Sequence, residues 1–371
     1  MNKDCKSVLL MGHLSPCIHG QATQYSELLR NSLVWKDIEI HPINAVYAKS
    51  REDVSSVSLR KLLLFLWYNI KMVATCVGTD ARLIILSPSF GRGVILRDIA
   101  TVLLAKYVCR MKVVGWVHMD PHRLELDEGM SIFNKFVKWG VRRFDYLVSC
   151  AESLPKGWPS YLRGSPEVSI PNALNVRLND CKRMRAGSKL RVGYLSSMED
   201  LKGWADLLTV SQRVEYPLKE IEFHFYGGSG VGEDTDSIRS LFESCDGANK
   251  VYWHGAVSGS AKSKAFLGMD IFCLPSHTEA FPLVILEAMS YSLPIIASNV
   301  GAISDAVDSC RGGWLYRAGD RDDLKHVLEE ALEQLDKWES MGEYNRSKFE
   351  EEYAMEKFSS RWHQFIVDVV N

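Results

Sequence analysis

Two glutamates stand on either side of an expected helix start in residues 274–301, LPSHTEAFPLVILEAMSYSLPIIASNVG. Glu279 belongs to a polar loop that follows an apolar run, and Glu287 lies five residues beyond Pro282. Proline is favoured at the first helical position, because the N–H group that it lacks has no intrahelical acceptor there. We therefore expect a helix from Pro282, with Glu287 about 7.5 Å along its axis and its side chain leaning back toward the helix start.

The same helix start has the chemistry of an anion site. The N–H groups of Leu283 and Val284 would lie at the positive end of the helix dipole, which suits a diphosphate. Carboxylates accept charge-assisted hydrogen bonds from hydroxyl groups, so Glu279 and Glu287 suit hydroxyls on either side of that diphosphate. Taken singly, each glutamate also fits a solvated loop charge or an ordinary helix residue. Their joint placement favours the ligand site.

A second loop supplies a cation. The segment GYLSSMEDLKG (193–203) follows an apolar run and places Lys202 directly before Gly203. A lysine at a strand end suits negative charge that develops on a leaving group, although a surface lysine before a helix has the same sequence. The glycines of GGSG (227–230) lack the G-x-G-x-x-G spacing, so Gly228 marks either a plain turn or a close approach to a ligand.

Histidines and aspartates of the chain make poor metal sites. His118 ends an apolar run, and Pro121 breaks any helix that would bring His118 and His122 to one face. Asp234 and Asp236 mimic a D-x-D motif but lie at a polar helix start, where aspartate caps naturally. We expect no metal and no other cofactor. His118 is then either a structural histidine or a hydrogen-bonding group at a strand end in the site.

Strands and helices that hold these loops alternate along the chain. Expected strands lie at 7–12, 81–87, 112–118, 145–150, 168–171, 190–196, 221–227, 250–255, 269–276, 293–298 and 312–317. Expected helices lie at 22–33, 59–74, 94–109, 132–143, 203–214, 235–244, 260–267, 282–291, 302–309 and 321–335. This alternation predicts α/β units on parallel sheets, in which ligands bind beyond the carboxyl ends of strands.

Two doubly wound, Rossmann-like domains are the expected architecture. The first domain is placed at 1–175, a polar linker at 176–189, the second domain at 190–350 and a C-terminal helix at 351–371. A chain of 371 residues with 46% hydrophobic and 24% charged residues can build a core in each domain. Nine scattered cysteines without a C-x-x-C pair indicate free thiols in a reducing cytosol.

The net charge of −2 argues against a dedicated nucleic-acid binder, but it is unevenly distributed. Residues 1–175 hold 22 Lys and Arg against 15 Asp and Glu, whereas residues 176–371 hold 22 against 31. The run LLLFLWYNI (62–70) is too short to cross a bilayer, which needs about 20 residues. We expect a buried crossover helix there, and a helix on an anionic membrane surface is the alternative.

The segment EAFPLVILEAM (279–289), followed by LPIIASNVG (293–301), resembles the signature of the retaining glycosyltransferases of family 4, also called group 1 glycosyltransferases. That family has the GT-B fold, two Rossmann-like domains facing across a cleft, and carries two glutamates separated by seven residues. The resemblance extends through 251–255, 270–276 and 313–315, and more loosely into the first half.

The resemblance implies a role for each matching residue. Glu279 would bind the donor sugar and Glu287 the nucleotide ribose, while Lys202 would neutralise the leaving diphosphate. Backbone contacts to the sugar would come from Ala280 and Phe281, and those to the phosphates from Leu283 and Val284. His118 would bind the donor sugar or the acceptor, Gly228 would lie near the nucleotide, and Gly20 of HLSPCIHGQAT (13–23) would belong to the loop that closes over the phosphates.

Three departures from the family pattern stand out. The family commonly has an arginine where this chain has Tyr194, so one cation of the phosphate clamp is missing. It often has glycine in place of Ala280, and only Gly20 remains of the usual glycine pair in the first domain.

The implied activity is retaining, metal-independent transfer from a nucleotide diphosphate sugar, by family frequency a UDP-sugar. The implied acceptor is a glycan, either a lipid-linked oligosaccharide or a lipopolysaccharide or O-antigen precursor, bound by the first domain. A basic first half suits an anionic acceptor or membrane leaflet, so we expect a cytoplasmic protein, peripheral on the membrane, without a nucleic-acid partner. The alternatives are a non-catalytic sugar-nucleotide-binding partner and a GT-B epimerase or synthase with a soluble acceptor.

Overall fold

The structure is a computed structural model that describes residues 6–13, 20–31, 33–47, 58–118, 124, 131–162, 164–176, 189–230, 234–247 and 249–371. The chain forms two compact units, namely unit 1 (Met1–Ala173 with Met355–Asn371) and unit 2 (Leu174–Ala354). The C-terminal segment from Met355 therefore belongs to the unit formed by the first half of the chain. Most of the expected linker, 177–188, lies outside the described residues.

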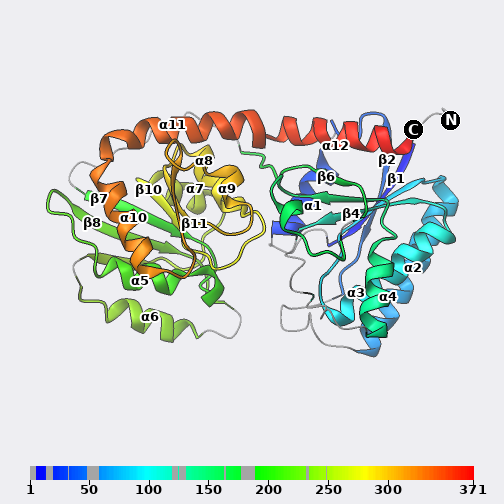
Figure 1. Cartoon of the computed structure of the whole chain (residues 1–371), viewed down its shortest axis with the longest axis horizontal. Coiled ribbons are helices and arrows are strands. Elements are labelled where there is room, and N and C mark those ends of the chain that lie inside the picture. Colours follow the sequence, from blue (N-terminus) through cyan, green and yellow to red (C-terminus); the bar gives the residue numbers. More distant parts are fainter. Residues whose placement is uncertain are drawn as a thin grey trace. The chain divides into compact units, whose positions relative to one another are not determined.

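Unit 1 is built on a six-stranded parallel sheet in the order β2-β1-β3-β4-β5-β6. Its strands are β1 (Lys6–Gly12), β2 (Ile38–Asn44), β3 (Leu83–Leu86), β4 (Lys112–Val117), β5 (Tyr146–Ser149) and β6 (Glu167–Ser169). Helices α2 (Leu59–Thr79), α3 (Arg92–Tyr107) and α4 (Ile132–Val141) pack on one face of the sheet. Helices α1 (Gly20–Arg30) and α12 (Met355–Val370) pack on the other face (Figure 1).

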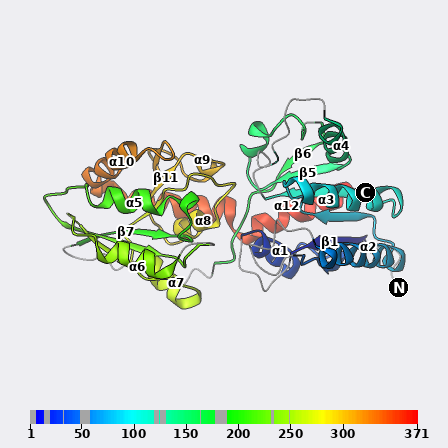
Figure 2. The ribbon, with the colours of Figure 1, turned by 90° about the horizontal axis from the view of Figure 1, so that it is seen from below.

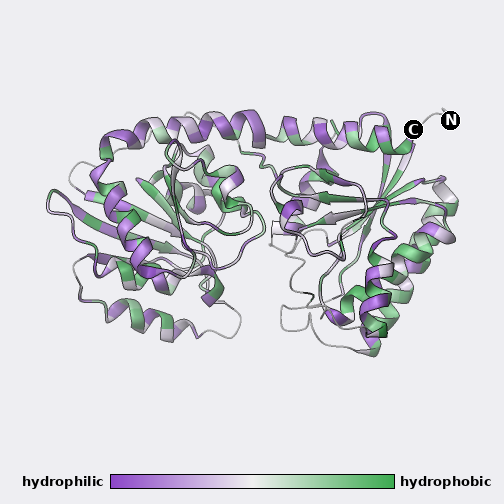
Figure 3. Ribbon diagram, in the orientation of Figure 1, coloured by the Kyte–Doolittle hydropathy of each residue, from purple (hydrophilic) through white to green (hydrophobic). Residues whose placement is uncertain are grey.

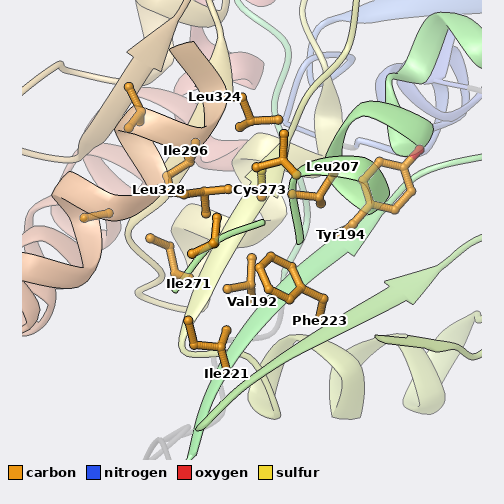
Figure 4. Close-up of a cluster of buried hydrophobic side chains, with 14 of the residues drawn as sticks. Val192, Tyr194, Leu207, Ile221, Phe223, Ile271, Cys273, Ile296, Leu324 and Leu328 are labelled. Atoms are coloured by element: carbon orange, nitrogen blue, oxygen red, sulfur yellow. The ribbon is translucent and has the colours of Figure 1, made fainter. Parts of the chain in front are cut away.

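Unit 2 is built on a second six-stranded parallel sheet, in the order β12-β11-β10-β7-β8-β9. Its strands are β7 (Lys189–Leu195), β8 (Glu220–Tyr226), β9 (Lys250–Trp253), β10 (Ile271–Leu274), β11 (Ile295–Ser298) and β12 (Gly313–Tyr316). Helices α5 (Trp204–Ser211), α6 (Thr235–Glu243) and α10 (Arg321–Glu333) share a core with one face. Figure 4 shows part of this core, with Val192 of β7, Phe223 of β8 and Ile271 of β10 gathered beside the α10 side chains Leu324 and Leu328.

The remaining elements of unit 2 complete its second face and its end. They are α7 (Gly259–Leu267), α8 (Leu283–Ser290), α9 (Ile303–Ala306), α11 (Trp338–Lys348) and the short helical turns η4 (Asp200–Lys202), η5 (Leu335–Lys337) and η6 (Phe349–Tyr353); η3 (Leu154–Gly157) belongs to unit 1. The ring of Phe266 in α7 lies 5.9 Å from that of Phe272 in β10, which seats α7 on this face. In the view of Figure 2, α7 and α10 lie at opposite sides of unit 2.

Strand order places the site loops of unit 2 side by side. From β7 the chain winds outward through β8 and β9, and from β10 it winds in the opposite direction through β11 and β12. Because β7 and β10 are neighbours, the loops that follow them leave the sheet at the point where the winding reverses, which is where doubly wound sheets bind ligands.

The expected α/β class with two doubly wound sheets is confirmed, and every expected strand is present within about two residues of its bounds. Strand β2 was not predicted from the sequence. Its segment IEIHPIN contains Pro42 and buries only Ile38 and Ile43, and β2 forms the edge of its sheet, where proline is tolerated. All six cysteines in the described part of the chain are free, as expected.

The helix expected at 59–74 is present as α2, but the prediction that it is buried is wrong. Helix α2 turns an apolar stripe outward, with Leu59, Leu62, Leu63, Leu66, Trp67, Ile70 and Val77 between 48% and 82% exposed. Among the described residues, α2 alone is long and apolar enough to cross a membrane by length and composition, and 17% of its most apolar window is buried. Both neighbouring strands, β2 and β3, pair with β1 in one sheet, so α2 is a crossover helix with a hydrophobic outer side. Figure 3 shows how far hydrophobic residues extend along this helix.

Candidate active site

Lys202 and Glu279 form the centre of the candidate site in unit 2. Lys202 Nζ donates a hydrogen bond to Glu279 Oε1 over 2.7 Å, and Ser276 Oγ donates to the same oxygen over 2.9 Å. Ser276 is fully buried, and the side chains of Glu279 and Lys202 are 11% and 26% exposed. The two predicted residues therefore come together as one ion pair, and a buried hydroxyl orients the carboxylate.

Backbone contacts hold the two loops against each other. The N–H group of His277 donates to the carbonyl oxygen of Leu201 over 2.9 Å. Gly203 has a φ of +69°, and a Cβ at this position would lie 1.8 Å from the carbonyl oxygen of Pro275. Glycine is required because the backbone of one loop passes where any side chain would begin. This contact places Lys202 within reach of Glu279.

Asp206 joins three elements beside this pair. Its carboxylate, in the first turn of α5, meets His277 Nε2 over 2.6 Å and accepts a hydrogen bond from Arg321 Nε of α10 over 2.6 Å. Asp206 is 7% exposed, and such a buried carboxylate is stable when it is hydrogen-bonded on both oxygens. Sequence reasoning missed this group, because no spacing signal links residues 71 positions apart.

Helix α8 begins one residue later than expected. Pro282 is extended, with φ −74° and ψ 122°, and stands at the N-cap, so Leu283 and Val284 are the first two helical residues. Their N–H groups belong to the first turn, which lacks intrahelical acceptors, so the anion site expected at these two residues stays a prediction. The proline fits here because its ring favours the extended conformation that precedes the helix.

The segment between Glu279 and the helix is anchored on both sides. The ring of Phe281 is buried and lies 5.7 Å from that of Tyr353. The carbonyl oxygen of Ala280 accepts a hydrogen bond from Ala302 N over 2.8 Å. Gly301, with a φ of +57°, passes so close to this segment that a Cβ would lie 2.2 Å from the carbonyl oxygen of Glu279. Ala280 and Phe281 are thus held by backbone and core contacts next to Glu279.

Glu287 meets a partner that sequence reasoning missed. Lys262 Nζ of α7 donates to Glu287 Oε1 over 2.6 Å, and the glutamate side chain is 20% exposed. Burial raises the pKa of Glu287 above its ordinary value, and the positive charge of Lys262 lowers it. The structure therefore gives each of the two predicted glutamates its own lysine.

Gly228 lies in the loop after β8, which packs on the loop after β7. The carbonyl oxygen of Gly228 accepts a hydrogen bond from Met198 N over 2.9 Å. A Cβ at Gly228 would meet ordinary contact, 3.4 Å from Ala256 Cβ, whereas one at Gly227 would lie 1.8 Å from the carbonyl oxygen of Ser196. The close backbone approach in this loop belongs to Gly227.

Tyr194 takes no part in the site surface. Its side chain is fully buried, its ring lies 5.6 Å from that of Phe225, and its hydroxyl donates to the carbonyl oxygen of Ser197 over 2.8 Å. Figure 4 shows Tyr194 extending from β7 beside Leu207 of α5. A residue that packs in this core cannot replace the cation that the family commonly has at this position.

The two remaining predicted residues belong to unit 1. His118 follows β4, and its ring lies 4.3 Å from the ring of Trp116. Gly20 is the first residue of α1, while 14–19 and His122 lie outside the described residues. Within the described ranges, no group of three or more His, Cys, Asp or Glu side chains is arranged to hold a metal ion.

Comparison with known proteins adds sequence relatives. Residues 182–348 match the family model described as glycosyl transferases group 1. An uncharacterized glycosyltransferase of Haemophilus influenzae is 26% identical over 60% of this chain and 61% of its own length. The N-acetyl-alpha-D-glucosaminyl L-malate synthase of Bacillus anthracis is 28% identical over 70% of this chain and 69% of its own length. The chain thus spans less than two thirds of the Haemophilus relative.

Solved structures resemble the whole chain in fold. Sucrose-phosphate synthase from Thermosynechococcus elongatus has a TM-score of 0.72 at 16% identity, covering 98% of this chain and 99% of its own. Anabaena HepE in complex with UDP and glucose has a TM-score of 0.69 at 15% identity, covering 97% and 99%. These similarities confirm the expected GT-B fold class.

Proposed function

Because residues 182–348 match the family model of the group 1 glycosyl transferases, we propose that this protein transfers a sugar from a nucleotide diphosphate sugar to a glycan acceptor. The donor binds in unit 2, at the loops that follow β7 and β10. The observation that carries this assignment is the 2.7 Å ion pair of Lys202 and Glu279. This pair supplies a cation for the diphosphate and a carboxylate for the sugar hydroxyls. It lies beyond β7 and β10, where the strand order of the sheet reverses.

The geometry supports a division of labour around the donor. The diphosphate lies against the first-turn N–H groups of Leu283 and Val284, where the helix dipole favours negative charge. Glu279 accepts hydrogen bonds from sugar hydroxyls and orients the anomeric carbon, and Glu287 accepts those from the ribose. Lys202 leaves Glu279 for the diphosphate as charge develops on it, because a dianionic leaving group attracts the ammonium more strongly than one carboxylate does.

Transfer then proceeds with retention and without a metal. The acceptor hydroxyl attacks the anomeric carbon from the face on which the diphosphate departs. The new bond joins the acceptor oxygen to the anomeric carbon, the bond from that carbon to the phosphate oxygen breaks, and the departing diphosphate takes the acceptor proton. Lys202 and the helix start supply the charge stabilisation that a metal ion supplies in other transferases. The proposal that the donor is a UDP-sugar is supported by the HepE structure, which contains UDP.

The acceptor is a lipid-linked oligosaccharide or a lipopolysaccharide or O-antigen precursor, reached from the cytoplasmic face of the membrane. Support comes from the outward apolar stripe of α2 and from α4, where Ile132 is 87% exposed. In the turn after α4, Arg143 lies over the ring of Trp139, 4.6 Å from its centroid. Both helices pack beside α3 on one face of the unit 1 sheet. An apolar surface with basic residues suits an anionic lipid surface.

A soluble acceptor is the second candidate. It is favoured by the similarity over 70% of this chain to a protein named as an N-acetyl-alpha-D-glucosaminyl L-malate synthase. Lipid-linked and soluble acceptors share the same donor chemistry in unit 2, so the two candidates differ only in what unit 1 binds.

A thermal-shift panel of UDP, GDP and ADP and their sugar conjugates tests the proposed function. A ligand at 100 times its Kd stabilises the fold by about 2.7 kcal/mol, which raises the melting temperature measurably. Stabilisation by one nucleotide and its sugar supports the donor assignment. A flat response to all of them contradicts it.

A further inference from the structure

Helices α7 and α8 contact each other at two levels, one turn apart. At one level the ring of Phe266 stacks on that of Tyr291, with centroids 5.1 Å apart and planes 11° apart. At the other level Lys262 Nζ reaches Glu287 Oε1 over 2.6 Å. Lys262 precedes Phe266 by four residues in α7, and Glu287 precedes Tyr291, the C-cap residue of α8, by four. The two partners from each segment therefore lie on one side of it.

The aromatic level holds the charged level in place. Phe266 is 1% exposed, and its ring also lies 5.9 Å from that of Phe272 in β10, so α7 is seated by the core. Lys262 lies one helical turn from this buried ring, so packing restricts the conformations of its aliphatic chain. Less conformational entropy is then lost when its ammonium group binds a carboxylate. Lys262 is 30% exposed and Glu287 20%, so water screens their interaction only in part.

We infer that Lys262 is a positioning residue for the donor nucleotide, and that its ammonium group holds the Glu287 carboxylate toward the pentose hydroxyls. This inference rests on the proposed function, since it adds a residue that orients Glu287 in the same donor site. Lys262 itself need not contact the nucleotide. Its effect reaches the ligand through Glu287.

Charge and burial around Glu287 explain why a partner is needed. Burial raises the pKa of this carboxyl, and Lys262 opposes that effect. Helix α8 also packs on α9, α11 and η6, whose cations are engaged elsewhere. Arg346 donates to Glu350 Oε1 and to the Ser290 carbonyl oxygen, and Lys348 donates to the carbonyl oxygens of Asp305 and Ala306. Without Lys262, protonation of Glu287 would become easier, and a protonated carboxyl accepts fewer hydrogen bonds.

The test is calorimetric titration of UDP and of 2′,3′-dideoxy-UDP into the full chain and its variants. Lys262→Met should weaken UDP binding by about tenfold to a hundredfold, the loss expected for a hydrogen bond to a charged group. The weakening should grow as the pH is lowered from about 8 to about 6. Dideoxy-UDP should bind Lys262→Met and wild type equally, since the hydroxyls that Glu287 would bind are gone.

Two further variants separate positioning from other effects. Lys262→Arg keeps the charge and should restore UDP affinity, and Lys264→Met, on the exposed side of the same helix, should match wild type. Equal loss of UDP and dideoxy-UDP affinity in Lys262→Met would overturn the inference, because the lysine would then act on the diphosphate directly. Unchanged UDP affinity in Lys262→Met with a loss in Glu287→Gln would also overturn it and leave the donor site intact. If wild type binds no nucleoside diphosphate, the proposed function fails together with the inference.

Discussion

Lys202 and Glu279, 77 positions apart in the chain, share a hydrogen-bonded ion pair of 2.7 Å where the loops after β7 and β10 meet. The ammonium group that we propose for the diphosphate and the carboxylate that we propose for the sugar are thus paired with each other. On the proposed function, donor binding replaces this internal pair by one contact of each residue with the ligand.

Substitution of Gly203 should lower the free energy of unfolding by more than the cost of placing a side chain on a left-handed backbone. In Gly203→Ala the new Cβ would meet the Pro275 carbonyl oxygen, so the two site loops must separate, and both stability and UDP affinity should fall. Gly259→Ala is the matched control, because Gly259 also has a positive φ, +52°, but nothing lies within 4 Å of the added Cβ. The control should lose only the backbone cost of about 1–2 kcal/mol. Equal losses by urea denaturation in both variants would contradict the steric account.

Asp206 should stabilise unit 2 more than the exposed arginine that it binds. Asp206→Ala removes a buried acceptor from both His277 and Arg321, and the free energy of unfolding should fall by about 1–3 kcal/mol. Arg321→Gln should cost less than about 1 kcal/mol, since its side chain is 49% exposed. Urea denaturation of both variants measures the difference. A larger loss in Arg321→Gln would place the stabilising contact elsewhere.

His224 and His254 should make the protein less stable in mild acid. Their rings are linked, Nδ1 to Nε2, over 3.0 Å, and burial lowers the pKa of both below the ordinary value of 6.5. The unfolded chain therefore takes up protons first, so stability is complete above about pH 6.5 and declines as the pH falls through the lowered pKa values of the folded state. The melting temperature should drop by a few degrees in this range.

Variants isolate the contribution of this histidine pair. His254→Phe keeps a ring beside Tyr226, whose centroid lies 4.4 Å away, and should flatten the pH dependence of the melting temperature. His326→Gln changes an exposed histidine of α10 and should keep the wild-type slope. A slope unchanged in His254→Phe would show that other groups govern the acid sensitivity.

The outward stripe of α2 should bind anionic vesicles. Leu63→Glu with Trp67→Glu places charges on exposed apolar positions, where folding does not depend on them, and removes about 1.5–3 kcal/mol of lipid burial per side chain. Co-sedimentation with phosphatidylcholine vesicles containing phosphatidylglycerol should fall more than tenfold. Leu218→Glu, at a similarly exposed leucine of unit 2, should sediment like wild type. Wild-type binding by the double variant would rule out α2 as the lipid-facing surface.

Much of the fold could be predicted from the sequence, because the strands of parallel sheets are short runs of apolar, β-branched residues. Runs such as 190–196 and 293–298 predicted β7 and β11 to within about two residues. The candidate loops were readable for a related reason, since polar residues that follow such runs must lie at the carboxyl edge of a sheet. The exposure of α2 could not be predicted from the sequence, because an apolar stripe has the same residue spacing whether it faces the core or the outside.

Partner residues from distant segments were also beyond sequence reasoning. Lys262 and Glu287 lie 25 positions apart on different helices, and their contact occurs beside the stacked rings of Phe266 and Tyr291. From the sequence, Tyr194 predicts a missing cation in the phosphate clamp. The sequence could not show that its ring belongs to the core rather than to the site surface.

The most direct test of the account is calorimetric titration of UDP and of the best-stabilising UDP-sugar into wild type, Glu279→Gln and Lys202→Met. Lys202→Met should weaken both ligands by about tenfold or more, since a hydrogen bond to a charged group is lost in each. Glu279→Gln should bind UDP at least as tightly as wild type, because Lys202 no longer has a carboxylate partner, yet lose the additional affinity that the sugar provides. Wild-type affinity of Glu279→Gln for the UDP-sugar, or of Lys202→Met for UDP, would contradict the assignment of this pair to the donor.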